Sequence, residues 1–224
     1  MTTGDDDRPS ALGPPSRTQG AGAVRLPPLP EEQWDDRTRE AVSHMLPRRL
    51  RNARGAGNGL STLLRHPDLT QAFLAFNNHL LLRSTLPPRV RELAILRVAK
   101  RRECAYEWAQ HVRLAAGLGL SEVQIEAAGR GEAADPFDRE VLRAVDELDG
   151  GTGLSDGTWE RLSKELDEKQ LMDLIFTVGG YAMLAVAFNT FGTAPEEPDA
   201  RPGDDATRAS AAGVGRGSKP GHER

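Results

Sequence analysis

The sequence predicts an all-α protein, and two kinds of pattern in its 224 residues carry that prediction. Apolar residues recur at helical spacing along most of the chain, and no convincing stretch alternates apolar with polar residues as a half-buried strand does. Helix-start signals precede several of these stretches, and glycines follow them. The pattern therefore favours a single helical domain.

The folded domain is expected to span residues 31–194. The stretches 1–30 and 195–224 are rich in Gly, Pro, Ser, Asp, Arg and Ala and hold almost no large apolar side chains, which lowers the mean hydropathy of the chain to -0.51. Segments of this composition bury too little surface to offset the entropy lost on ordering. Both tails are therefore expected to be disordered.

Three helices are expected in the first half of the domain. Pro30, followed by two glutamates, predicts a helix to about residue 45, because Pro and acidic residues favour a first turn. Residues 54–58 read Arg-Gly-Ala-Gly-Asn and predict a loop. Pro67 opens the next helix, and Pro88 opens a third that runs to about residue 100.

Five helices are expected in the second half: about 103–116, a short one after Ser121, 135–148, 155–166 and 167–191. Gly117 follows the first as a natural stop, and Ser121 with Gln124 forms a capping box for the second. The last helix is apolar nearly all round. Such a helix must be buried in the core or at a subunit interface.

Composition excludes several classes of function. Net charge is -4 and the sequence pI is about 5.8, with no basic stripe, so no nucleic-acid partner is expected. The single cysteine, Cys104, rules out an intramolecular disulfide and suits a reducing compartment. The N-terminus lacks a signal-peptide pattern, and the most apolar stretch, 174–188, is shorter than the roughly 20 residues that span a bilayer. A soluble, cytoplasmic protein without a membrane partner is predicted.

The candidate site lies on the helix expected at 103–116. At 100° per residue, Cys104, Glu107 and His111 share one stripe with apolar residues, while Tyr106 falls on the opposite side. Glu107 and His111 are four residues apart, close enough to hydrogen-bond. A thiol, a carboxylate and an imidazole are thus expected on a surface that faces the core.

Glu92 adds a second carboxylate from the preceding helix, where it shares an apolar face with Ile95, Leu96 and Ala99. If the two helices pack as a hairpin, Glu92 can meet His111 or Cys104. Buried carboxylates are costly unless paired, and burial raises the pKa of a carboxyl group. Such a set can act as general acid and base without a metal or organic cofactor.

Simpler structural interpretations remain open at this stage. The Glu107–His111 spacing also fits a surface pair, Cys104 fits a small buried apolar residue, and Glu92 fits an ion pair with Arg89 or Lys100. His79 either borders the site or is a satisfied core histidine. Zinc binding by the thiol, carboxylate and imidazole is conceivable, but no paired-Cys or His-Glu-x-x-His spacing supports it, so no metal is expected.

The segment 89–111 resembles the carboxymuconolactone decarboxylase and alkylhydroperoxidase D-type family. The matching features are Pro-Pro-Arg89, an Arg-Glu-Leu-x-x-Leu-Arg-Val run that contains Glu92, then Cys104, Tyr-Glu-Trp and His111, followed by Ala-Gly-Leu-Gly-Leu-Ser. The resemblance extends more weakly over 25–193. It implies an alkylhydroperoxidase D-like helical bundle that forms a homo-oligomer, a trimer or a hexamer.

The resemblance also implies roles for the residues at matching positions. The family's peroxidase branch carries a Glu that falls at Glu92, a first Cys at Cys104, a proton-relay residue at Tyr106, a second Cys at the position of Glu107, and a His at His111. Glu107 therefore replaces the peroxide-attacking thiol. A chain with one cysteine cannot run a dithiol–disulfide cycle within a subunit, which favours the decarboxylase-like branch.

The function predicted on this basis is a cofactor-independent lyase that acts on a small carboxylate or lactone. Glu107 and His111 would form the acid–base pair, Glu92 would orient His111, and Cys104 would shape the pocket. Substrate-binding candidates are Arg89, Arg97 and His79. A thiol-dependent peroxidase that uses Cys104 with an external thiol is the first alternative, and a non-enzymatic oligomeric binding protein is the second.

Overall fold

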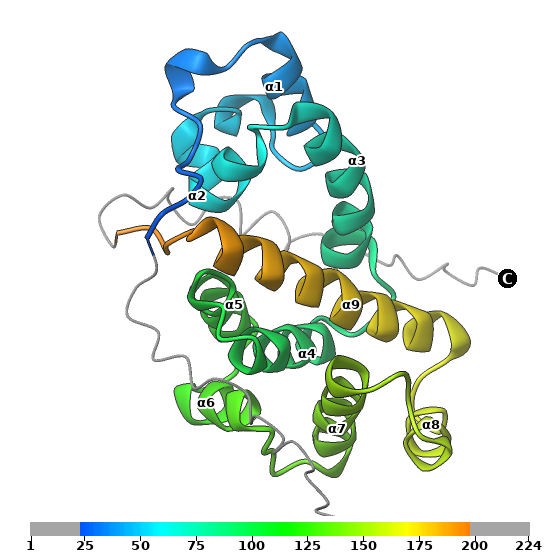
Figure 1. The fold of residues 1–224 in the computed structure, drawn as a ribbon. Coiled ribbons are helices and arrows are strands. Elements are labelled where there is room, and N and C mark those ends of the chain that lie inside the picture. The colour runs from blue at the N-terminus through cyan, green and yellow to red at the C-terminus, as the bar shows by residue number, and fades with distance from the viewer. Residues whose placement is uncertain (1–22, 198–224) are drawn as a thin grey trace, which may run out of the picture.

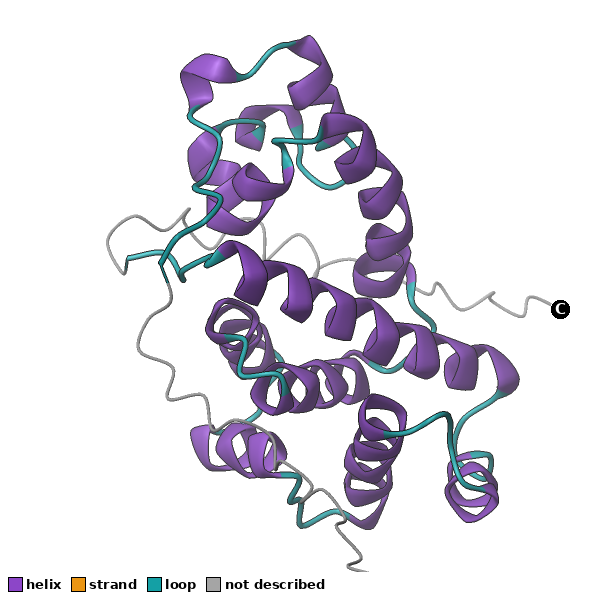
Figure 2. Ribbon diagram, in the orientation of Figure 1, coloured by secondary structure: helices purple, strands orange, loops and turns teal. Residues whose placement is uncertain are grey.

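A computed structural model describes residues 23–197, and this part of the chain is helical, with no strand (Figure 2). The elements are η1 (Glu31–Gln33), α1 (Asp36–Ala41), η2 (Arg48–Leu50), α2 (Ala53–Leu63), α3 (Pro67–Asn78), η3 (His79–Arg83), α4 (Pro88–Arg101), α5 (Ala105–Gly117), α6 (Glu122–Arg130), α7 (Pro136–Gly150), α8 (Asp156–Leu162) and α9 (Glu168–Phe191). The predicted all-α class is confirmed for these residues.

Helix α4 lies at the centre of the bundle, where it packs against α5, α6, α7 and α9. Figure 1 shows α9 crossing the molecule, with α1 to α3 on one side and α4 to α8 on the other. The middle of α4 is buried from Val90 to Leu96 without a break. Any polar side chain in that stretch, Glu92 included, must therefore find its partners inside the protein.

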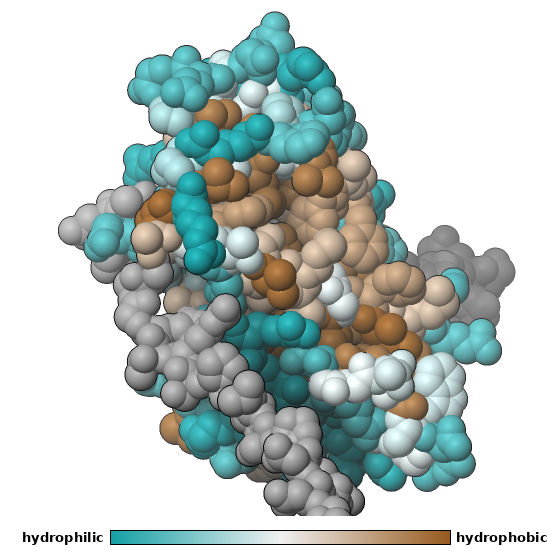
Figure 3. Space-filling model, viewed as in Figure 1, coloured by the Kyte–Doolittle hydropathy of each residue, from teal (hydrophilic) through white to brown (hydrophobic). Residues whose placement is uncertain are grey.

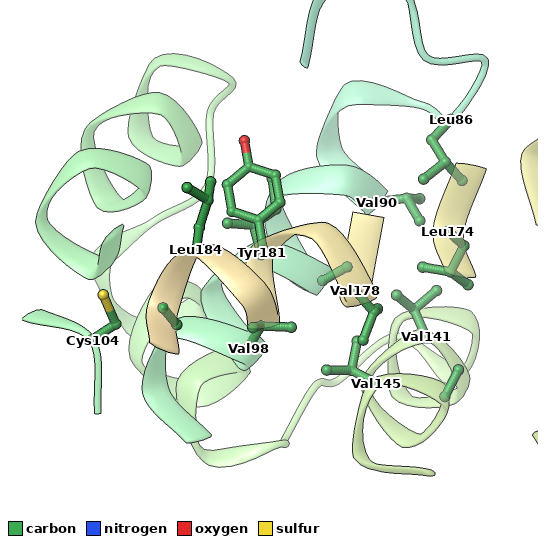
Figure 4. Packing of buried hydrophobic residues seen from close by; sticks show 14 of the residues in the cluster. Leu86, Val90, Val98, Cys104, Val141, Val145, Leu174, Val178, Tyr181 and Leu184 are labelled. Carbon is green, nitrogen blue, oxygen red and sulfur yellow. The ribbon is translucent and has the colours of Figure 1, made fainter. Parts of the chain in front are cut away.

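Three apolar clusters hold the helices together. The largest joins α4, α7 and α9 through residues such as Val98, Val145 and Val178 (Figure 4). A second lies among α1, α2 and α3 around Trp34, and a third fixes α6 against α4 and α5. The candidate site lies where the largest cluster meets α5, since Cys104 belongs to that cluster.

The helix starts in the second half follow the signals read from the sequence. The Ser121–Gln124 capping box is present at α6, and Asp167 with Gln170 forms another at α9. Asp135 caps α7 by accepting from the backbone N–H groups of Phe137 and Asp138. These polar side chains satisfy backbone donors that a helix leaves open at its first turn.

Two element predictions in the first half are wrong. The helix expected from Pro30 to about residue 45 is instead the 3-10 turn η1 followed by the short α1, because Asp35 caps a new helix by accepting from Thr38 N. The loop expected at 54–58 lies inside α2, where only Gly57 leaves helical geometry, with φ at 64°. Asn52 starts that helix by accepting from Gly55 N, a cap that the glycines obscured.

The ordered chain extends beyond the limits expected for the domain. Arg25 N and Leu26 N both donate to Phe191 O, at 2.8 and 3.1 Å, and Leu29 N donates to Ser61 O at 2.9 Å. After α9, the side chain of Glu196 accepts a hydrogen bond from Asn58 N at 2.9 Å. The rest of both predicted tails lies outside the described residues.

Helix α9 is longer than its most apolar stretch indicated. Its 24 residues make it long and apolar enough, by length and composition, to cross a membrane. However, 56% of its most apolar window is buried within the fold, where α9 packs against α4 and α7. More than half of that window therefore belongs to the core of the bundle.

Candidate functional site

A hairpin of α4 and α5 brings Glu92 to His111, as the sequence predicted. Helix α4 ends at a tight turn in which Glu103 adopts a left-handed φ of 51° and Cys104 N donates to Ala99 O. Helix α5 then runs back along α4. His111 Nδ1 lies 2.7 Å from Glu92 Oε2, and both side chains are buried, at 7% and 0% exposure.

The surroundings of Glu92 keep it ionised. Burial raises the pKa of this carboxyl group, but the charge of His111, the hydrogen bond from it and the charge of Arg91 lower the pKa further, so the net direction is downward. Arg91 Nε donates to Glu92 Oε1 at 3.2 Å. A carboxylate only accepts hydrogen bonds, so His111 donates to Glu92 through Nδ1.

In contrast to Glu92, Glu107 has no hydrogen-bond partner for its buried carboxyl group within the described residues. Burial raises the pKa of Glu107 to about 8, with only a partial opposing effect from the nearby Cys104 thiol. The hydrogen bond to His111 that the sequence left open does not form, because His111 is held by Glu92. Glu107 is therefore largely protonated near neutral pH.

Cys104 lies at the N-cap of α5, one residue before the helix, and is buried. Burial raises the pKa of its thiol to about 12, and the charge of Glu107 adds to the shift. The thiol interacts with Glu107 without the geometry of a hydrogen bond. At neutral pH the group is a neutral, apolar-like thiol rather than a nucleophilic thiolate.

Tyr181 completes the cluster, and sequence reasoning missed it. Its ring projects from α9 into the bundle (Figure 4) and packs edge-on against His111, with ring centroids 5.0 Å apart. The pKa of its phenol is raised by burial and by the charges of Glu92 and Glu107. The sequence feature that could have indicated Tyr181 is its position as a hydroxyl-bearing residue within the apolar stretch of α9.

Tyr106 points away from this cluster. Its ring packs edge-on against Phe188, with centroids 4.8 Å apart, and burial together with the charge of Glu196 raises the pKa of its hydroxyl. A Cβ atom at Gly59 would lie 2.5 Å from that hydroxyl, so only glycine permits the approach of α2. The structure thus places the Tyr106 ring between Phe188 and α2, and its role in a proton relay stays a prediction.

The three substrate-binding candidates also lie elsewhere. Arg89 pairs with Asp138 at 2.7 Å, and Arg97 pairs with Asp146 at 2.7 Å, so both guanidinium groups fasten α4 to α7. His79 Nε2 lies 2.9 Å from the Asp173 carboxylate, which also accepts from Thr85. Asp173 is eight residues before Tyr181 on α9, about 12 Å along the helix axis.

Arg91 is the arginine that the structure brings to the cluster. Its side chain is 11% exposed, and its charge acts on both Glu92 and Tyr181. The sequence offered no reason to prefer it, because neighbouring positions on α4 also carry arginine. Asp138 and Asp146 of α7 pair with Arg89 and Arg97. The packing of α7 therefore determines that Arg91 is the arginine next to the buried Glu92.

No group of three or more His, Cys, Asp or Glu side chains within 23–197 is arranged to hold a metal ion. One pocket is lined by residues near both ends of the domain, among them Val24, Leu26, Asn58 and Gly192, and Glu107 is not one of its lining residues. His111 and Glu107 are 5% and 2% exposed. Both side chains are therefore almost closed off from solvent.

Comparisons with known proteins agree with this fold. Residues 67–150 match the model of the carboxymuconolactone decarboxylase family. One similar solved structure is a protein of unknown function from Agrobacterium tumefaciens, described as a candidate antioxidant defence protein AhpD. It is 24% identical with a TM-score of 0.53, and the alignment covers 59% of this chain and 94% of that one.

A second similar structure comes from Ralstonia eutropha JMP134, an uncharacterized peroxidase-related protein described as an alkylhydroperoxidase AhpD core. It is 16% identical with a TM-score of 0.64, and the alignment covers 77% of this chain and 93% of that one. No curated protein matches the sequence. The family resemblance is confirmed, while identities this low show the shared fold alone.

Proposed function

Because residues 67–150 match the model of the carboxymuconolactone decarboxylase family and lie in an alkylhydroperoxidase D-like fold, we propose that this chain is a cofactor-independent lyase. It removes carbon dioxide from a small carboxylate or lactone by acid–base chemistry. The observation that carries the proposal is the buried, protonated Glu107, which lies one helical turn before the Glu92–His111 pair on the same hairpin.

The unpartnered carboxyl of Glu107 supports a ligand site. A buried polar group without a hydrogen-bond partner costs roughly 1–3 kcal/mol. Nothing in the surrounding fold recovers that cost, since both oxygens lack a partner within the described chain. A bound carbonyl or enolate oxygen would supply the missing partner by accepting the carboxyl proton.

The reaction assigns a separate task to each group. When the carbon–carboxylate bond of the substrate breaks, its electron pair moves onto the conjugated carbonyl oxygen, and the enolate so formed accepts a hydrogen bond from Glu107 or His111. One of these two groups then transfers a proton to carbon, and water restores the proton after product release. Glu92 keeps the His111 ring oriented, and Arg91 places a positive charge beside the Glu92 carboxylate.

A thiol-dependent peroxidase is the first alternative, and the peroxidase-related description of the Ralstonia protein makes it worth testing. That chemistry needs a thiolate. Cys104 is buried, and its thiol pKa is raised to about 12. We therefore expect peroxide consumption with an external thiol to be negligible and unchanged in Cys104→Ser.

The proposal is tested by a screen of β-keto acids and unsaturated lactones for release of carbon dioxide. Glu107→Gln and His111→Ala should each abolish turnover while the protein stays folded. His79→Ala is the matched control, since it removes an imidazole that pairs with Asp173 away from the cluster. Full activity in both site variants would refute the proposed roles.

A non-enzymatic binding protein is the second alternative, and the same variants separate it. If no substrate in the screen is turned over and Glu107→Gln lowers thermal stability, the polar cluster is a structural network.

We place the protein in the cytoplasm as part of the proposal, because its one free thiol suits a reducing compartment.

A further inference from the structure

The side chain of Glu196 is held by two helices that are distant from it in the sequence. Its Oε1 accepts a hydrogen bond from the backbone N–H of Asn58 on α2 at 2.9 Å, and its Oε2 accepts from Gln110 Nε2 on α5 at 2.5 Å. The Asn58 side chain also donates to Ala194 O at 3.0 Å. Figure 1 shows the chain after α9 lying beside α2. Glu196 therefore occupies a site that the folded domain forms.

Tyr106 supplies a third hydrogen-bond donor to the same carboxylate. Its side chain is buried, and its hydroxyl accepts from the backbone N–H of Gly59, so the phenol proton is directed to Glu196. Burial and the charge of Glu196 raise the pKa of this phenol. The hydroxyl thus keeps its proton at neutral pH and acts as a donor. We name Asn58, Tyr106 and Gln110 the donor site.

Two glycines leave the space that the carboxylate and the phenol fill. A Cβ atom at Gly57 would lie 2.5 Å from Glu196 Oε1, and one at Gly59 would lie 2.5 Å from the Tyr106 hydroxyl. Gly57 has a left-handed φ of 64°, and this break in helical geometry leaves the N–H of Asn58 to donate to the carboxylate. Backbone N–H groups exposed by such turns form anion sites.

The chemistry of the donor site matches an anion with two oxygens. A backbone N–H, a side-chain amide and a phenol all donate to the occupant. The guanidinium of Arg113 donates to Gln110 Oε1, which leaves Gln110 Nε2 facing Glu196 and adds a positive charge nearby. Hydrogen bonds to an ionised carboxylate are roughly twice as strong as those between neutral groups. A carboxylate therefore suits this site better than a neutral ligand.

A small pocket adjoins the donor site, because Asn58 belongs to both. The hydroxyl of Thr193 in the pocket wall has no hydrogen-bond partner among the described residues. Figure 3 shows apolar residues exposed between α2 and α9, on the side where the described chain ends lie. A ligand whose carboxylate takes the place of Glu196 can extend a short alkyl chain over the apolar part of the wall, which includes Val24, Leu26 and Pro28.

We propose that the donor site binds a small aliphatic carboxylate, which enters when the Glu196 side chain swings out. Glu196 is then a competitor tethered to the protein, present at an effective concentration on the order of millimolar. The intact chain should therefore bind such an acid more weakly than a chain without that carboxylate. The donor site shares no residue with the Glu92–His111 pair, so the inference does not depend on the proposed lyase activity.

Isothermal titration calorimetry of the full chain at pH 7, with sodium propionate and sodium hexanoate, tests the proposal. Glu196→Ala should bind both acids at least about tenfold more tightly than the wild type, because the tethered competitor is gone. Hexanoate should bind roughly tenfold more tightly than propionate, since its longer chain buries more methylene groups. Glu197→Ala is the matched control: it removes the next carboxylate along the chain, which is exposed, and should behave as the wild type.

Two variants in the Glu196→Ala background show whether the acid occupies the donor site. Tyr106→Phe, which keeps the ring that packs against Phe188, and Gln110→Leu should each weaken binding by roughly tenfold. Absence of saturable binding to Glu196→Ala at tens of millimolar acid would overturn the proposal. So would equal affinity in the wild type and Glu196→Ala, or binding that neither donor variant weakens, because the acid would then lie elsewhere. Equal affinity for the two acids would overturn the assignment of the pocket to the alkyl chain.

Discussion

Replacing Glu107 by glutamine should make the protein more stable at neutral pH, although the same change is expected to abolish turnover. In the unfolded chain a glutamate has a pKa of 4.5, while in the fold the pKa of Glu107 is about 8. Between these values the unfolded state releases a proton that the folded state keeps. Unfolding therefore becomes easier as pH rises, by about 1.4 kcal/mol for each pH unit.

The magnitude follows from the width of that pH window. Below pH 4.5 both states are protonated and Glu107 carries no ionisation penalty. At pH 7 the penalty reaches about 3 kcal/mol, and above pH 8 it levels off at about 5 kcal/mol. Glutamine has nearly the same shape and stays neutral, so the cost of burying its unpartnered polar atoms largely cancels in the comparison.

The assay is urea unfolding of the wild type and Glu107→Gln from pH 4.5 to 8.5. The stability difference should be near zero at the acid end and should grow steadily with pH in favour of the variant. Glu160→Gln serves as the control, because Glu160 is exposed on α8 and its removal should give a flat difference. A pH-independent difference for Glu107→Gln would show that Glu107 is not a buried neutral acid.

Three further predictions follow from the same structure. Glu92→Gln should lower stability by roughly 3–5 kcal/mol, because it leaves the buried Arg91 charge without its carboxylate, and thermal unfolding would measure the loss. Native Cys104 should react with a disulfide reagent at pH 8 about a thousand-fold more slowly than in urea, given its thiol pKa of about 12. Arg97→Ala should cost roughly 1–3 kcal/mol in urea unfolding without loss of turnover, since it breaks the link from α4 to Asp146 and to Gly129 O but touches no site group.

The helices of the second half could be predicted because local signals and long-range packing agree there. Capping residues such as Ser121 and Asp135 set the starts, and the apolar periods between them match the buried faces. In the first half the signals conflict. Gly57 interrupts α2 with a left-handed φ, yet Asn52 caps the helix and the core around Trp34 buries it, a tertiary effect that local propensity does not contain.

The candidate site was likewise only partly predictable from the sequence. The Glu92–His111 contact followed from two helical faces and one short turn, so periodicity was enough to place it. Arg91 and Tyr181 could not be placed, because their orientation depends on elements distant in sequence. The pairing of Arg89 and Arg97 with α7 decides which arginine is left for Glu92, and the path of α9 decides which residue covers His111.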